Sequence, residues 1–257
     1  MILCGGRGTR LQEHTHSIPK ALVEIGGRPI LWHVINIYAA QGLGRFLLAT
    51  GYLGEMIEEF VAAEAWPAGV EIECVDTGLD TPTGGRVKVV EERLGGPTFC
   101  ATYADGVADI DLAALVGFHR AHRGLATVTV VRPRSQFGVA ELAGDGRVST
   151  FHEKPRLDHW VNGGFFCFEP RVFDYFEESS VLEREPLERL AADGRLHAYR
   201  HQGFWDCMDT YKDAVMLNDL WDSGNAPWRV WEVPQGAPRV AEPASSQPAG
   251  GRGGSNL

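Results

Sequence analysis

The stretch "MILCGGRGTRL" at residues 1–11 joins a short apolar run to a loop made of glycine and arginine. The apolar run stops at Gly5, which is typical of a buried strand that leads into a loop. The three glycines permit positive φ and let backbone N–H groups approach a ligand, and the two arginines add fixed positive charge. Open α/β sheets bind ligands at the carboxyl ends of their strands. The stretch therefore predicts an anion site beside a first parallel strand, although a tight turn with solvated arginines would share its local sequence.

The glycine loop matches neither of two common phosphate-binding motifs. A Walker loop needs GxxxxGK[ST], and the dinucleotide fingerprint GxGxxG fails at Leu11. Further along, Pro19 holds the chain extended, so that Lys20 returns towards the loop. Arg7, Arg10 and Lys20 then converge within the first 20 residues of an acidic chain. A polyphosphate is the expected occupant.

Composition narrows the possible partners. The chain has 257 residues, 44% of them hydrophobic, and a formal net charge of −10. An acidic balance argues against nucleic acid or an anionic membrane as a main partner. No apolar run approaches the ~20 residues that span a bilayer. The five cysteines are dispersed and form no CxxC pair, so we expect reduced thiols and a cytoplasmic location.

Strands and helices alternate in the first half of the sequence, and strands dominate after Thr127. The patterns predict strands near 1–4, 45–50, 70–76 and 98–105 and helices near 28–44, 54–66 and 111–122. Asp145-Gly146 between two alternating runs predicts a hairpin. Helical patterns return near 186–194 and 211–224. This order predicts an α/β fold, a Rossmann-like three-layer sandwich with a mixed, mostly parallel central sheet and an added strand-rich part.

We expect one continuous domain over residues 1–233. Its first part covers about 1–126 and its strand-rich second part about 127–233. Residues 234–257 are dense in Pro, Gly and Ser and lack apolar periodicity, so we expect a disordered tail.

Several separate motifs resemble those of the sugar nucleotidyltransferases, which join a nucleoside triphosphate to a sugar 1-phosphate. They occur in the family's order over roughly residues 1–231, and they are most similar to the glucose-1-phosphate cytidylyltransferase branch. The motifs are "LCGGRGTRL", "PKALVEIGGRPILWH", "VDTGLDTPTGGRVK", "TYADGVADID", "FHEKP", "VNGGFFCFEP", "VLEREPLERLA" and "GFWDCMDT". The resemblance implies that the first part of the domain binds the nucleotide and the second part binds the sugar.

The resemblance implies a metal site at Asp105 and Asp209. Phosphate chemistry of this kind calls for a divalent cation held by carboxylates, and Mg²⁺ is the expected cofactor. Asp105 ends an apolar strand, but Asp105-Gly106 alone also suits a simple turn. Asp209 alone also suits a helix N-cap. Asp206 lies nearby and is ranked lower, because the family varies there.

The phosphate contacts that the resemblance implies come from Arg10, Lys20 and Lys154. Arg10 would hold the departing pyrophosphate, Lys20 the nucleotide phosphates and Lys154 the attacking sugar phosphate. Glu153 beside Lys154 suits sugar hydroxyls, although a solvated pair at a strand end would have the same sequence. The sugar-binding residues that we expect are Tyr103, Gly138, Glu153, Asn162 and Gly163. Asn162 with its glycines also suits a β-bulge.

The nucleotide pocket is expected at the first loop and at "TGLDTPTGGRVK". The second segment is read as a small polar, glycine-rich loop that presents Arg86 to a cytosine edge, and a mobile lid would have the same composition. The residues expected to bind the nucleotide are Leu3, Gly5, Gly6, Gly8, Thr9, Thr81, Gly84, Gly85 and Arg86.

The reaction that these expectations describe is transfer of a nucleotidyl group from CTP to glucose 1-phosphate, releasing pyrophosphate. One alternative keeps the chemistry with dTTP, UTP, GTP or ATP, or with another sugar or cyclitol 1-phosphate. A second alternative is a regulatory subunit that senses nucleotide sugars without catalysis. Both substrates are small molecules, so we expect neither nucleic acid nor membrane as a partner, and the resemblance implies a homo-oligomer.

Overall fold

The structure is a computed structural model, and it describes residues 1–8, 17–94 and 96–232. Thr9 and Arg10 of the predicted site lie outside the described residues, as does the segment 234–257. Their predicted roles stay predictions. Within the described residues, no helix is both long enough and apolar enough to cross a bilayer.

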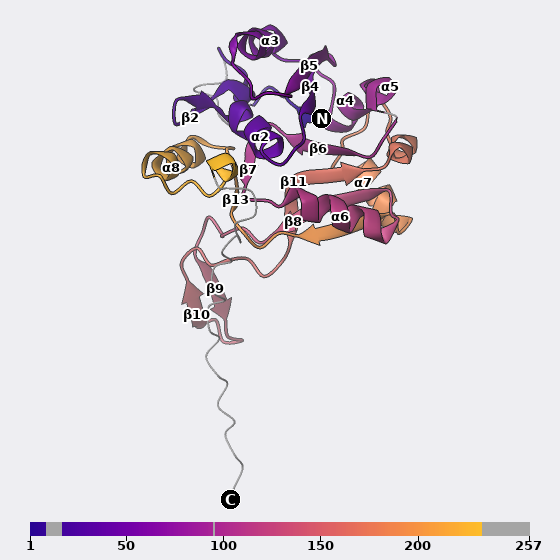
Figure 1. The fold of residues 1–257 in the computed structure, drawn as a ribbon. Coiled ribbons are helices and arrows are strands. Elements are labelled where there is room, and N and C mark those ends of the chain that lie inside the picture. The colour runs from indigo at the N-terminus through magenta and orange to yellow at the C-terminus, as the bar shows by residue number, and fades with distance from the viewer. Residues whose placement is uncertain (9–16, 95, 233–257) are drawn as a thin grey trace, which may run out of the picture.

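A seven-stranded sheet forms the centre of the molecule, in the order β12-β8-β11-β6-β1-β4-β5 (Figure 1). Six strands run parallel, and β11 is antiparallel to both of its neighbours. The mixed, mostly parallel sheet is therefore confirmed. The strands are β1 (Ile2–Leu3), β4 (Arg45–Thr50), β5 (Glu71–Asp76), β6 (Phe99–Tyr103), β8 (Ala126–Val131), β11 (Val161–Phe168) and β12 (Leu196–Arg200).

Helices cover both faces of the sheet, because alternate side chains of each strand point to opposite sides. Phe165 and Cys167 of β11 belong to the apolar core that α2, α6 and α8 complete. Phe166 and Phe168 belong to a second core that includes side chains of α4 and α7. The α-helices are α2 (Ile30–Ala39), α3 (Gly54–Ala63), α4 (Thr83–Val89), α5 (Glu91–Leu94), α6 (Leu112–His122), α7 (Glu185–Ala192) and α8 (Tyr211–Asp222), and the 3₁₀ helices are η2 (Lys20–Leu22), η3 (Pro170–Tyr175) and η4 (Val230–Glu232). The three-layer arrangement is as predicted.

Three pairs of short strands lie outside the central sheet. β7 (Gly106–Ala108) pairs with β13 (Trp205–Cys207), and β2 (Glu24–Ile25) pairs with β3 (Arg28–Pro29). β9 (Val139–Leu142) and β10 (Val148–His152) form the predicted hairpin, which projects from the rest of the molecule (Figure 1). Every residue of these two strands is exposed.

The segment 77–88 is expected to be a glycine-rich loop, but its second half, from Thr83, belongs to helix α4, which is a correction to the sequence interpretation. Pro82 precedes the helix in an extended conformation, as suits a helix start. Gly84 and Gly85 let the helix lie directly on another segment, since a Cβ on either residue would come within 3 Å of the backbone of residues 178–180. Glycine serves here for close packing between chain segments, which composition alone does not reveal.

His33 joins helix α2 to the end of the described chain. Its Nε2 lies 2.9 Å from the carbonyl oxygen of Ile25, and Trp228 donates its indole N–H to Nδ1 over 3.3 Å. These partners assign the proton to Nε2. Burial lowers the pKa of His33 to about 4, so the ring stays neutral. Edge-on rings of Trp32 and Trp221 complete the surroundings.

Candidate active site

The centre of the sheet places the first loop beside Asp105. β1 lies between β4 and β6 and runs parallel to both, with Leu3 paired with Tyr103. The amide of Ala104 donates to the carbonyl oxygen of Leu3 over 3.3 Å. Gly5 and Asp105 therefore follow neighbouring parallel strands at the same edge of the sheet, where α/β proteins bind ligands.

Backbone pairing brings Asp209 to Asp105, although the two residues are far apart in the sequence. Cys207 of β13 lies opposite Gly106 of β7, and the amide of Met208 donates to the carbonyl oxygen of Asp105 over 2.9 Å. The main chain thus fixes the spacing of the two aspartates, whatever their side chains do.

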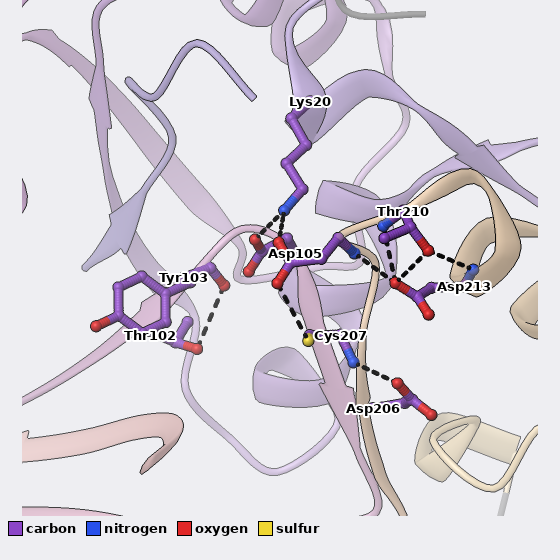
Figure 2. Close-up of polar contacts among 9 residues, drawn as sticks. Lys20, Thr102, Tyr103, Asp105, Asp206, Cys207, Thr210 and Asp213 are labelled. Atoms are coloured by element: carbon purple, nitrogen blue, oxygen red, sulfur yellow. Dashed lines mark hydrogen bonds and ion pairs between the residues drawn. The ribbon is translucent and has the colours of Figure 1, made fainter. Parts of the chain in front are cut away.

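Lys20 lies between the two carboxylates (Figure 2). Its Nζ is 2.5 Å from Oδ2 of Asp105 and 2.6 Å from Oδ1 of Asp209. Burial acts to lower the pKa of Lys20, but the two aspartates outweigh it and raise the pKa, so the ammonium stays charged. Pro19 is extended, as predicted, and Lys20 then begins the single turn η2. We call Lys20, Asp105 and Asp209 the charged cluster.

The N-cap of helix α8 is Thr210 and not Asp209, for which this role was the alternative. Thr210 forms a capping box with Asp213. The carboxylate of Asp213 also accepts a hydrogen bond from the amide of Asp209 over 3.1 Å. The side chain of Asp209 is therefore directed to Lys20 and not to the helix.

Asp206 does not join the charged cluster. Figure 2 shows its side chain on the other side of β13 from Lys20, where it accepts a hydrogen bond from the amide of Cys207 over 2.8 Å. Burial raises the pKa of Asp206 to about 6. Adjacent side chains of a strand point to opposite faces, so Asp206 faces away from its neighbour Cys207, whose thiol lies 3.8 Å from Oδ2 of Asp209.

Arg86 lies beneath the first loop. Its guanidinium donates to the carbonyl oxygens of Gly5, Thr50 and Gly78 over 2.8 to 2.9 Å, and the residue is 4% exposed. A Cβ at Gly5 would overlap the guanidinium. Arg86 thus fixes the backbone of the loop from below, and the missing side chain of Gly5 leaves room for the guanidinium. A direct contact between Arg86 and a base stays a prediction.

The other nucleotide candidates gather around the same loop. Gly8 has a φ of 61°, and a Cβ at Gly6 would meet no atom within 4 Å. The hydroxyl of Thr81 donates to the carbonyl oxygen of Thr77 over 2.5 Å. Open space at Gly6 is what a loop needs if a ligand is to approach its backbone.

Tyr103, Asn162 and Gly163 of the sugar prediction come together where β11 borders β6. The side-chain oxygen of Asn162 accepts a hydrogen bond from the amide of Gly164 over 2.8 Å. Gly164 has a φ of 78°, and a Cβ there would press on the ring of Tyr103. The pairing of β11 with β8 shifts register between Asn162 and Phe166, which agrees with the β-bulge interpretation, and the sugar contact of these residues stays a prediction.

Glu153, Lys154 and Gly138 lie at the base of the hairpin. Lys154 has a φ of 47°, in the left-handed region that costs an ordinary residue about 1 kcal/mol or more. Its side chain is half exposed, and Nζ lies 3.9 Å from Oε1 of Glu153. A Cβ at Gly138 would meet the ring of Phe151 and the carboxylate of Glu153. These three residues therefore form a group of their own.

Sequence analysis missed Glu183, which contacts both predicted parts of the site. Its carboxylate accepts hydrogen bonds from the hydroxyls of Tyr103 and Thr83. The surrounding "VLEREP" offers three charged side chains in a row, and nothing in the local pattern distinguishes Glu183 from the others.

The geometry is that of a nucleotide-processing α/β protein, with a glycine loop, paired carboxylates and a lysine at the carboxyl edge of a parallel sheet. The chain belongs to the nucleotidyl transferase family, whose model matches residues 1–221. It is 42% identical over 252 residues to the probable glucose-1-phosphate cytidylyltransferase of Bacillus subtilis, an alignment that covers 90% of this chain and 99% of that protein. It is 41% identical over 259 residues to the glucose-1-phosphate cytidylyltransferase of Salmonella typhimurium, with the same coverage.

Solved structures agree on the fold. The crystal structure of HddC from Yersinia pseudotuberculosis superposes with a TM-score of 0.67 at 20% sequence identity, covering 86% of this chain and 97% of that one. The predicted α/β class and the resemblance to nucleotidyltransferases are both confirmed.

Proposed function

We propose that the protein transfers the cytidylyl group of CTP to glucose 1-phosphate, forming CDP-glucose and pyrophosphate. The observation that carries the proposal is the charged cluster, in which a lysine and two aspartates from three distant segments meet beside the first loop. The choice of CTP and glucose 1-phosphate rests on the names of the relatives that align along most of the chain.

In this reaction an oxygen of the sugar phosphate attacks the α-phosphorus of CTP in line with the departing pyrophosphate. The attacking group is already an anion, so no general base is needed, and positioning with charge neutralisation carries the catalysis. We assign the nucleotide phosphates to Lys20, the sugar phosphate to Lys154 and the pyrophosphate to Arg10. Each of these cations stabilises charge that phosphoryl chemistry redistributes.

Asp105 and Asp209 suit a Mg²⁺ ion. Their carboxylate oxygens converge on one point, where the ammonium of Lys20 already stands as a cation. Among the described residues no group of three or more His, Cys, Asp or Glu side chains is placed to hold a metal ion. Mg²⁺ is commonly bound by one or two carboxylates together with substrate phosphates, so two aspartates are a sufficient contribution from the protein. When bound, the ion would neutralise phosphate charge.

We assign the base to the wall formed by the first loop and the start of α4. Thr81 and Gly84 border that wall, and Arg86 shapes it by fixing the carbonyl oxygens of Gly5 and Gly78. We assign the hexose to Asn162 and Gly163 with Glu153. A homo-oligomeric state and a cytoplasmic location stay predictions from the sequence.

The test is pyrophosphate release, measured with each of the five common nucleoside triphosphates against a panel of sugar 1-phosphates in the presence of Mg²⁺. We expect CTP with glucose 1-phosphate to give the highest kcat/KM. A higher kcat/KM with another pair of substrates would support nucleotidyl transfer but contradict the assignment of CTP and glucose 1-phosphate. Pyrophosphate release with none of the pairs, together with tight binding of a nucleotide sugar, would favour the sensor instead.

A further inference from the structure

Glu183 connects two surfaces of the proposed site that come from distant parts of the chain. We call them the nucleotide wall, at Thr83, and the sugar wall, at Tyr103. One carboxylate oxygen accepts a hydrogen bond from the hydroxyl of Tyr103, and the other accepts a hydrogen bond from the hydroxyl of Thr83 over 2.8 Å. Tyr103 is the last residue of β6, two positions before Asp105. Thr83 is the first residue of α4. Each oxygen of a single carboxylate thus holds one wall.

The backbone around Glu183 is anchored, which fixes the point from which its exposed side chain extends. The amide of Leu182 donates to the hydroxyl oxygen of Thr83 over 2.9 Å, and the amide of Gly85 donates to the carbonyl oxygen of Ser180 over 3.0 Å. Leu182 is fully buried. Gly84 and Gly85 pack closely on residues 178–180, and this packing brings the start of α4 within reach of Glu183.

Tyr103 is held on its other side by the sugar wall. Its ring lies against Gly164 and makes an edge-on contact with Phe166, with ring centroids 5.9 Å apart. Burial and the nearby carboxylate of Glu183 raise the pKa of Tyr103, so its hydroxyl stays protonated and remains a donor. A shift of Glu183 would therefore be transmitted to the ring that faces Asn162 and its glycines.

We propose that Glu183 is a positioning residue, which couples the nucleotide wall at Thr83 to the sugar wall at Tyr103. This inference rests on the proposed function. It adds that the two substrates bind with synergy, because filling one wall orders the carboxylate that orients the other. A carboxylate is required, since one side chain must offer an acceptor oxygen to each of two hydroxyl donors.

The first experiment compares Glu183→Gln and Glu183→Ala with the wild type. The amide of glutamine keeps one acceptor oxygen and replaces the other by a donor, so only one wall stays connected. For Glu183→Ala we expect KM for CTP and KM for sugar 1-phosphate each to rise about 5- to 10-fold, with kcat within about threefold. Glu183→Gln should fall between the two. Glu188→Gln is the matched control, because Glu188 is exposed on α7 nearby.

The second experiment measures synergy directly by calorimetry. The affinity for a non-reacting CTP analogue is measured with and without glucose 1-phosphate. In the wild type we expect the sugar phosphate to tighten binding of the analogue, and in Glu183→Ala we expect this gain to vanish. If Glu183 were merely structural, its replacement would weaken the affinity for the analogue equally with and without glucose 1-phosphate, and the ratio of the two affinities would not change.

A double-mutant cycle links the effect to the two hydroxyls. Tyr103→Phe and Thr83→Val should be non-additive in the wild type and additive in the Glu183→Ala background. Additivity in both backgrounds, or unchanged synergy in Glu183→Ala, would overturn the positioning role while the proposed function stood. If the wild type released pyrophosphate from no pair of substrates, the proposed function would fail first and the coupling with it. Thermal unfolding of each variant checks that the fold is retained.

Discussion

The two halves of the proposed site are built on very different supports. Lys20, Asp105 and Asp209 are fixed by a buried parallel sheet and by the pairing of β7 with β13. Glu153 and Lys154 lie at the base of a two-stranded hairpin in which every strand residue is exposed. An isolated hairpin of this kind is marginally stable in water.

The difference teaches where preorganisation is needed. Carboxylates that must share one cation need fixed spacing, because their mutual repulsion would otherwise separate them. A lysine that binds a diffusing anion needs an extended, accessible side chain more than a rigid one. Lys154 meets this need, since its side chain is half exposed beyond the end of β10. Substitutions in the rigid half should therefore have larger effects than substitutions in the exposed half.

The largest effect is expected in the sheet itself. Phe166 is fully buried on β11, between β8 and β6, the strand that leads to Asp105. Replacing it with alanine should lower the free energy of unfolding by about 3–5 kcal/mol, because a cavity is left in a core that cannot collapse fully. Urea denaturation measures this change. A loss below 1 kcal/mol would mean that the sheet is less rigid than its packing indicates.

Asp209→Asn should reduce kcat by about 10²- to 10³-fold at saturating Mg²⁺, since one charge of the pair is lost. The matched control is Asp206→Asn, three residues earlier and directed away from Lys20. Its activity should stay within about threefold of the wild type. Steady-state pyrophosphate release gives both values, and full activity of Asp209→Asn would remove the metal assignment.

Acid should lower the free energy of unfolding, because two histidines that pack in the body of the molecule resist protonation in the folded state. Burial lowers the pKa of His33 and of His122 to about 4 in the folded protein. Between about pH 6.5 and pH 4 the unfolded chain therefore binds protons that the folded chain excludes. After discounting His122 for its solvent exposure, these two histidines should lower the free energy of unfolding through this window by an amount on the order of 2 kcal/mol and add nothing further below it. Protonation of buried Asp206, whose pKa is raised to about 6, acts in the opposite direction.

Urea denaturation at a series of pH values measures the effect. His152→Gln on the exposed hairpin is the control, and it should keep the slope of the wild type. His33→Gln should reduce the slope. An unchanged slope in His33→Gln would show that other groups govern the acid sensitivity.

Lys154→Ala should raise KM for sugar 1-phosphate about 10-fold and KM for CTP less than twofold, because its assigned contact is with the attacking phosphate. Arg147→Ala is the matched control, since Arg147 is an exposed cation at the tip of the same hairpin. Equal changes in both Michaelis constants would contradict the assignment of Lys154.

The smallest effect is expected at Phe137, which is 76% exposed beside the hairpin. Phe137→Ala should change the free energy of unfolding by less than about 0.5 kcal/mol, because little apolar contact is lost. Urea denaturation beside Phe166→Ala gives the contrast directly. A loss as large as that of Phe166→Ala would mean that the hairpin is covered in solution.

The sequence allowed good predictions wherever local pattern and chemistry coincide. The apolar run before the first loop and the strand that ends at Asp105 were identified from periodicity and glycine placement, and their parallel pairing is confirmed. Asp209 was reached through the family resemblance alone, because the hydrogen bond from Met208 to Asp105 joins segments that no local pattern connects.

Other features depend on the direction of a side chain, which composition does not contain. The sequence predicts a contact of Arg86 with the base of the nucleotide, which stays a prediction, but it does not reveal that the guanidinium supports the loop from beneath. Gly84 and Gly85 suggested a loop, yet they lie in a helix that packs closely on residues 178–180. Glu183 was missed, because its importance arises from two partners 80 and 100 residues away along the chain.

The charged cluster also bears on how the chain folds. The contacts of Lys20 span 85 and 189 residues of sequence, so they form only after the N-terminal strand has entered the middle of the sheet and β13 has reached β7. A nascent chain that has not yet emerged as far as Asp209 holds one acid and one lysine but lacks the second acid. The phosphate-binding capacity that we propose for the cluster is therefore complete only after Asp209 has been synthesised and β13 has paired with β7.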